Sequence, residues 1–91
     1  MTRSCKLKPK YRLVLVEWED SAQPIAAWTW VDEHKPAPVR CLSVGYLIAK
    51  TKGTLALAAN LGDLDRERAQ ASGIIQIPRR CIIRIVELRL T

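Results

Sequence analysis

The chain has 91 residues, of which 48% are hydrophobic and 26% are charged, and its formal net charge at pH 7 is +6. This length is typical of a single domain, and the composition is that of a globular protein rather than a disordered one. No apolar run approaches the roughly 20 residues of a membrane span. The charges of MTRSCKLKPK are not followed by the apolar segment of a signal peptide, so we expect a cytoplasmic protein without a membrane partner.

The excess positive charge lies at the N-terminus. Residues 1–12 contain no acidic residue and five basic ones, Arg3, Lys6, Lys8, Lys10 and Arg12. We therefore predict a basic, flexible arm over residues 1–10, followed by one domain over residues 11–91. Such an arm favours phosphates or other polyanions, because binding them releases counterions. A disordered terminus that only improves solubility is the competing interpretation.

The first part of the domain predicts one strand and two breaks. Residues 11–18 (YRLVLVEW) are rich in β-branched and aromatic side chains and form the first expected strand. Both of its faces are apolar, which fits a small barrel or an oligomer interface better than an open sheet. Turn-forming residues fill 19–26 and 32–38. Between them, residues 27–31 (AWTWV) place Trp28 and Trp30 on the same face if the chain is extended.

The second part predicts four more strands. Residues 39–50 form the longest, and Gly45 at its middle indicates a bulge or sharp bend, as at a barrel corner. Residues 54–60 return after a turn, and 61–72 predict a short helix or a loop. Residues 73–77 and 81–90 are strands separated by a tight turn at Pro78; a helix over 81–90 is disfavoured by its Ile and Val content. The predicted fold is a mainly β, strongly bent, five-stranded small barrel.

Little in the sequence indicates catalysis or metal binding. Cys5, Cys41 and Cys81 are far apart, no CxxC is present, and His34 is the one histidine, so a structural zinc site is not expected. We interpret Cys41 and Cys81 as reduced, buried thiols. A nucleophilic pair of Cys41 and His34 has no support beyond the presence of both residues. We therefore expect no enzyme, no cofactor and no metal.

The tryptophans are the strongest sign of a binding site. We expect Trp18 in the core, and leave Trp28 and Trp30 open between core, subunit interface and ligand stacking. In the last case they would stack on a base. The phosphates would then be held by the basic residues of two predicted turns, Lys50, Lys52, Arg79 and Arg80.

Two resemblances follow from these segments. The bent strand, hairpin and insertion, followed by IQIPRRCIIRIVEL, resemble the Sm-like and Src-homology-type small barrels over about residues 39–90. In addition, VEWEDS, SVGYLIAK, LALAANL and IQIPRRCIIRI are similar to segments of short proteins carried by tailed bacteriophages, over most of residues 13–90. The second resemblance implies a phage or prophage origin and brings no established activity.

These observations leave two main hypotheses. The first is a non-enzymatic accessory protein that binds nucleic acid or a phosphorylated, nucleotide-like ligand, for example to sequester a nucleotide of host defence. The alternative is a protein-interaction module that inhibits a host protein or assists phage assembly, with the tryptophans as interface hot spots. The core of so short a chain is thin, so we also expect a homo-oligomer.

Overall fold

The computed structural model describes residues 11–22 and 24–89. The predicted arm over residues 1–10, with Arg3, Lys6, Lys8 and Lys10, lies outside this range. The described chain forms one antiparallel sheet of five strands in the order β4-β3-β2-β1-β5. The strands are β1 (Leu13–Asp20), β2 (Val39–Lys50), β3 (Thr54–Gly62), β4 (Gln70–Pro78) and β5 (Ile82–Leu88), with two 3-10 helices, η1 (Val31–Glu33) and η2 (Arg79–Cys81). This confirms the mainly β prediction. Neither described helix has the length and apolar character needed to cross a membrane.

Strand β2 links two parts of the sheet, and Gly45 lies where they meet. Residues Val39–Tyr46 of β2 pair with β1, whereas its last residues, from Tyr46 to Lys50, pair with β3. A Cβ atom at position 45 would lie 2.9 Å from the Ala58 carbonyl oxygen and 3.1 Å from the Leu57 Cβ. A glycine is therefore required for the close approach of β2 and β3.

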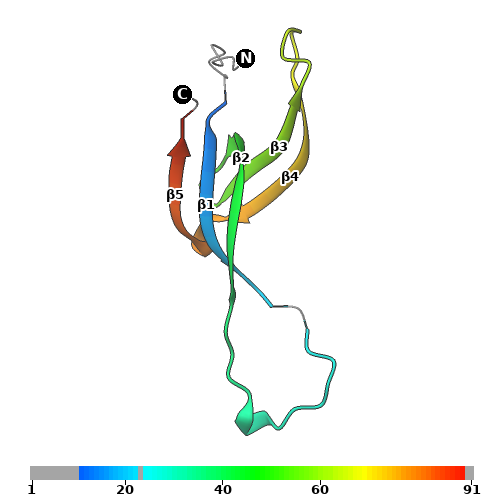
Figure 1. Ribbon diagram of the computed structural model, residues 1–91, viewed down its shortest axis with the longest axis vertical. Helices are drawn as coiled ribbons and strands as arrows, with labels where there is room; N and C mark the ends of the chain where they lie inside the picture. Colours follow the sequence, from blue (N-terminus) through cyan, green and yellow to red (C-terminus); the bar gives the residue numbers. More distant parts are fainter. Residues whose placement is uncertain (1–10, 23, 90–91) are drawn as a thin grey trace, which may run out of the picture.

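The sheet is strongly curved (Figure 1), and one of its faces carries the core. Val14, Val16 and Trp18 alternate along β1 and pack with Leu57 of β3 and Ile77 of β4. The indole Nε1 of Trp18 donates a hydrogen bond to the Ser43 hydroxyl over 3.0 Å. The buried indole thus has a partner for its one polar group, and the prediction that Trp18 belongs to the core is confirmed.

The predicted closure into a barrel is wrong. Strands β4 and β5 are the two edges of the sheet, and the described residues form no β4–β5 ladder. The η2 turn joins them at one corner, and from there β4 continues along β3 while β5 continues along β1 (Figure 1). Closure requires a compatible tilt and stagger of every neighbouring pair, which a bent strand alone does not provide.

Two segments whose conformation the sequence left open are largely irregular. Residues 27–30 form no strand, and η1 follows them. The expected helix or loop over 61–72 is a loop restricted to residues 63–69, because β3 continues to Gly62 and β4 begins at Gln70. The loop starts at Asp63, whose φ of 54° is left-handed. The tight turn after Pro78 and the strand that follows it are confirmed as η2 and β5.

Candidate functional site: a basic corner and an apolar arm

Four basic residues lie close to the β2–β3 turn and η2: Lys50 is the last residue of β2, Lys52 is in the turn, and Arg79 and Arg80 are in η2. The β2–β3 turn contacts η2, because the Arg79 backbone N–H donates to the Gly53 carbonyl over 2.9 Å. The Arg79 side chain adds a second contact, in which Nε donates to the Thr51 carbonyl over 2.9 Å. We call the resulting group the basic corner; it consists of Lys50, Lys52, Arg79 and Arg80. The sequence predicts that these four residues hold phosphate beside Trp28 and Trp30; the two contacts of Arg79 place the β2–β3 turn against η2.

The backbone of the basic corner is well ordered by hydrogen bonds. The Thr51 hydroxyl accepts from the backbone N–H groups of Gly53 (3.3 Å) and Thr54 (3.1 Å). The Thr51 N–H in turn donates to the Thr54 carbonyl over 2.8 Å. All four basic side chains are exposed, and none takes part in the three ion pairs of the described residues. The backbone of the basic corner is therefore held in place, while its four positively charged side chains remain accessible to a ligand.

The basic corner continues toward the N-terminal end of the domain. Arg12 and Lys50 line the same shallow hollow of about 360 Å³, whose floor is formed by residues 47–49 of β2. The position of Arg12 is fixed by its carbonyl, which accepts from the Leu47 N–H over 2.8 Å. The last basic residue of the N-terminal group is thus a neighbour of the basic corner.

The long connection between β1 and β2 extends away from the sheet (Figure 1). We call residues 24–38 the β1–β2 arm; every residue in it is exposed. Trp28 is fully exposed, at 103%, and Trp30 is 76% exposed. The Cα radius of gyration is accordingly 17.7 Å, compared with about 12 Å for a compact domain of this length. The two tryptophans do not belong to the core, so subunit interface and ligand stacking remain.

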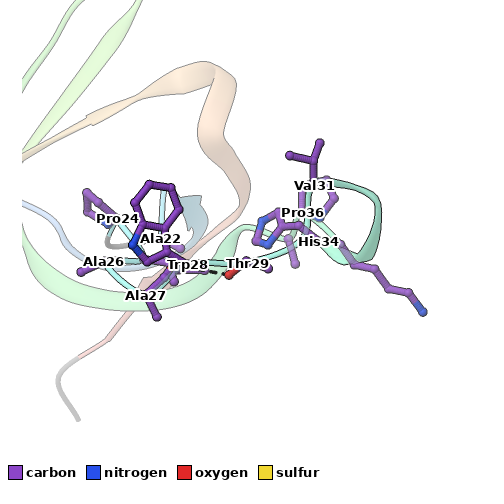
Figure 2. Close-up of a pocket in the computed structure, with 12 residues that line it drawn as sticks. Ala22, Pro24, Ala26, Ala27, Trp28, Thr29, Val31, His34 and Pro36 are labelled. Carbon is purple, nitrogen blue, oxygen red and sulfur yellow. Dashed lines mark hydrogen bonds between the residues drawn. The ribbon is translucent and has the colours of Figure 1, made fainter.

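The β1–β2 arm curves around an open hollow of about 1000 Å³. Figure 2 shows Trp28 beside Pro24 and a series of alanines on one limb, and Val31, His34 and Pro36 on the other. The arm holds its shape with few internal bonds, such as that from the Glu33 N–H to the Trp30 carbonyl at 3.1 Å. It points away from the sheet, so Trp28 and Trp30 do not join the basic corner in one site within a single chain (Figure 1).

A charged cluster centred on β1 was not expected from the sequence. The Glu17 carboxylate, 15% exposed, accepts from Arg40 of β2 over 2.6 Å and lies 3.3 Å from Nε of Arg84 of β5. The three residues come from three strands, and only the register brings them together. No local pattern in the sequence could have indicated this cluster.

The same side of the sheet carries an unusual apolar surface. Alternation on β1 directs Leu13 and Leu15 away from the core, and Leu15 lies between Val44 of β2 and Val86 of β5 in the register. Leu42 and Val44 are 67% and 55% exposed. We call this surface the outer face; its residues are Leu13, Leu15, Leu42, Val44 and Val86. The apolar second face of the first strand was the sequence signal for it.

The remaining candidates for chemistry are dispersed. Cys41 and Cys81 are free thiols and are half-buried against the core rather than fully buried as expected. Within residues 11–22 and 24–89, no three His, Cys, Asp or Glu side chains are grouped as metal ligands would be. No family model, no curated protein and no solved structure matches the chain.

Proposed function

We propose that the protein is a non-enzymatic binding protein whose basic corner holds the phosphates of a nucleic acid or of a nucleotide-like ligand. The observation that carries the proposal is the hollow shared by Arg12 and Lys50. It joins the basic corner to the N-terminal segment, which contributes four further positive charges and no negative ones. Closely spaced, unpaired cations on one surface bind phosphates through counterion release.

The shape of this surface favours an extended ligand. The hollow between Arg12 and Lys50 is open, and the basic corner itself is formed by exposed side chains at the end of β2, in the β2–β3 turn and in η2. A small nucleotide is usually enclosed on several sides, whereas a strand of nucleic acid needs only a row of cations along its backbone. We therefore propose nucleic acid as the first ligand to test, with free nucleotides as competitors.

We further propose an origin in a phage or prophage and a place of action in the host cytoplasm. The support is the resemblance of four segments to short phage proteins. Sequestering a phosphorylated signal of host defence is one form that this function could take.

The test measures binding of a labelled oligonucleotide by fluorescence anisotropy over a series of salt concentrations. The variant Lys52→Gln/Arg80→Gln removes two charges from the basic corner, and the control Arg66→Gln/Arg68→Gln removes two from the loop at the opposite end of β3. We expect the first variant to reduce the slope of log K against log salt by roughly 1.5. The control is expected to leave the slope nearly unchanged. Equal effects of both variants would contradict a defined site, and competition by a nucleoside triphosphate would identify a nucleotide ligand.

The exposed tryptophans favour a protein-interaction module as a second candidate. Tryptophan is enriched in interface hot spots, and full exposure of Trp28 is costly without a partner. Comparing the proteins captured from host lysate by the wild type and by Trp28→Ala/Trp30→Ala tests this candidate. Capture of the same protein by both would exclude the tryptophans as its binding site.

A further inference from the structure

The β1–β2 arm and the outer face are two unpartnered apolar surfaces of the same chain. The arm exposes Ile25, Trp28, Trp30 and Val31, and the outer face exposes Leu42, Val44 and Val86. Each is costly to leave in water, because apolar surface contributes roughly 25 cal/mol per Å² when it is buried. Exposed apolar patches of this extent usually mark an interface.

We propose that the β1–β2 arm of one copy of this chain packs on the outer face of a second copy, and that the second copy returns the same contact. The result is a two-fold symmetric dimer with exchanged arms. In a two-fold symmetric dimer the contact between arm and outer face occurs twice. Two-fold symmetry is also the commonest symmetry of homo-oligomers.

The direction of the β1–β2 arm favours the outer face of a second copy over the outer face of the same chain. Asp20 and Val39 pair with each other at the base of the arm, so both of its ends leave the sheet along the strand direction. The arm then continues away from the sheet (Figure 1). To cover its own outer face, the arm would have to reverse at both ends, whereas a second copy can present its outer face directly ahead.

Charged groups at the edges of the two surfaces can pair with each other. Helix η1 of the arm carries Asp32 and Glu33 and no basic residue. At the rim of the outer face, Arg40 and Arg84 share the single carboxylate of Glu17, and both guanidinium groups remain largely exposed. Glu19 lies opposite Arg40 in the register and balances the net charge of the rim, but the exposed guanidinium groups keep donors for the carboxylates of η1 of the second copy. Such contacts fix the orientation of a docking surface more than its affinity.

The area available matches that of a stable dimer. A tryptophan contributes 150–250 Å² on burial, so the four arm tryptophans of two copies contribute roughly 600–1,000 Å². The outer faces lose a similar area, which brings the total to roughly 1,200–2,000 Å², the range of specific and stable interfaces. This inference is independent of the proposed phosphate site, because the basic corner belongs to neither surface.

Sedimentation velocity of the full chain over a wide concentration range provides the first test. We expect a monomer–dimer equilibrium with a dissociation constant on the order of micromolar or lower. The arm variant is Trp28→Ala/Trp30→Ala, and the face variant is Leu42→Gln/Val44→Thr; all four side chains are exposed in one chain, so neither variant disturbs the core. Each is expected to weaken the dimer roughly tenfold or more. The control Leu64→Gln, at an exposed leucine of the loop 63–69, is expected to change nothing.

A mixture of the two variants distinguishes arm exchange from other dimers. The arm variant has an intact outer face and the face variant has an intact arm, so the mixed pair keeps one arm–face contact while each variant alone keeps none. We expect the mixture to associate more strongly than either variant. The emission of Trp28 and Trp30 in the face variant is expected to shift to shorter wavelength when the arm variant, whose remaining tryptophan is Trp18, is added.

Three results would overturn the proposal. The first is a wild-type monomer at every concentration, and the second is a dimer that both variants leave unchanged. The third is a mixture that associates no better than the separate variants, since a symmetric arm–arm or face–face contact behaves in this way. Oligonucleotide binding by the same variants, all of which keep the basic corner, shows separately whether the proposed function holds.

Discussion

At the scale of single residues, Gly45 shows most directly how the sequence determines the bend of the sheet. The Gly45→Ala substitution places a methyl group 2.9 Å from the Ala58 carbonyl oxygen, which belongs to the backbone of β3 and cannot move without loss of sheet hydrogen bonds. We expect a loss of about 1–3 kcal/mol in the free energy of unfolding. The measurement is urea denaturation followed by circular dichroism.

Gly53→Ala is the matched control for this prediction. No atom lies within 4 Å of a Cβ built on Gly53, and its φ is not in the left-handed region. The added methyl group therefore meets no resistance and reduces the entropy of the unfolded chain. We expect the stability of this variant to be unchanged or slightly higher. A loss equal to that of Gly45→Ala would show that steric approach at β3 is not the cause.

Glu17 is the second residue with a specific role, because it connects β1 to both of its neighbouring strands. Replacing it with glutamine removes the shared ion-pair partner of Arg40 on β2 and Arg84 on β5, the two strands that flank β1. Exposed pairs contribute about 0.2–1 kcal/mol each, and Glu17 is largely buried, so we expect a total loss of about 1–2 kcal/mol. The loss is expected to shrink in high salt, where the repulsion between the arginines is screened.

Glu19→Gln is the control for the Glu17 prediction. Glu19 lies two residues further along the same face of β1 but is exposed and forms none of the ion pairs of the described residues. Its substitution is expected to change the unfolding midpoint little. A similar effect of both substitutions would indicate that general net charge, rather than the bridging geometry of Glu17, determines the stability.

At the scale of elements, β4 carries both a core residue and an exposed apolar residue within a few positions. Ile77 is fully buried and lies opposite Leu55, whereas Ile74 is 51% exposed and lies opposite Ala58. We expect Ile77→Val to cost about 0.5–1.5 kcal/mol through loss of packing. The same change at Ile74 is expected to stay within about 0.5 kcal/mol. Thermal unfolding of both variants, at equal protein concentration, checks the difference; equal losses would contradict the assigned faces of β4.

Elements were predictable from the sequence where the information is local. The alternation of Val14, Val16 and Trp18 indicates a strand with a buried face, and Pro78 followed by two arginines indicates a turn. Gly45 indicates the bend, because a glycine weakens the interior of an apolar strand and is favoured there where the backbone bends or a neighbouring strand approaches closely. Each of these signals depends on neighbouring residues only, and the structure agrees with all of them.

The rest was not predictable, because it depends on which strands pair and in what register. Closure of a barrel requires β4 and β5 to pair with each other. The sequence of neither strand indicates whether this pairing forms, and in the structure both are sheet edges. The grouping of Glu17 with Arg40 and Arg84 requires the register of three strands. The position of Trp28 and Trp30 outside the sheet depends on how residues 24–38 leave it, which no periodicity encodes. The β2–β3 turn and η2 lie together because β3 pairs with β4, with Thr54 opposite Pro78, so the basic residues that flank these positions are close.

At the scale of the whole molecule, the uneven distribution of charge is the dominant feature. Residues 1–10 hold four basic residues and no acidic one, out of a net charge of +6. Arg12 and Lys50 share a hollow, so the point where this segment joins the domain is next to the basic corner. A polyanion long enough to contact both would neutralise more phosphates than either surface could alone, and the salt dependence of binding reports that number.

Deleting residues 2–10 tests whether the molecule acts as one continuous cationic surface. We expect the truncated chain to keep its unfolding midpoint, since all five strands of the sheet lie between Leu13 and Leu88. We also expect it to lose oligonucleotide affinity, with a reduction of the salt slope by roughly 3. Adding Lys52→Gln/Arg80→Gln to the truncation is expected to lower the slope further by the amount seen in the full chain. If the corner substitutions have no further effect after truncation, the N-terminal segment binds the polyanion by itself, and the basic corner is not part of the site.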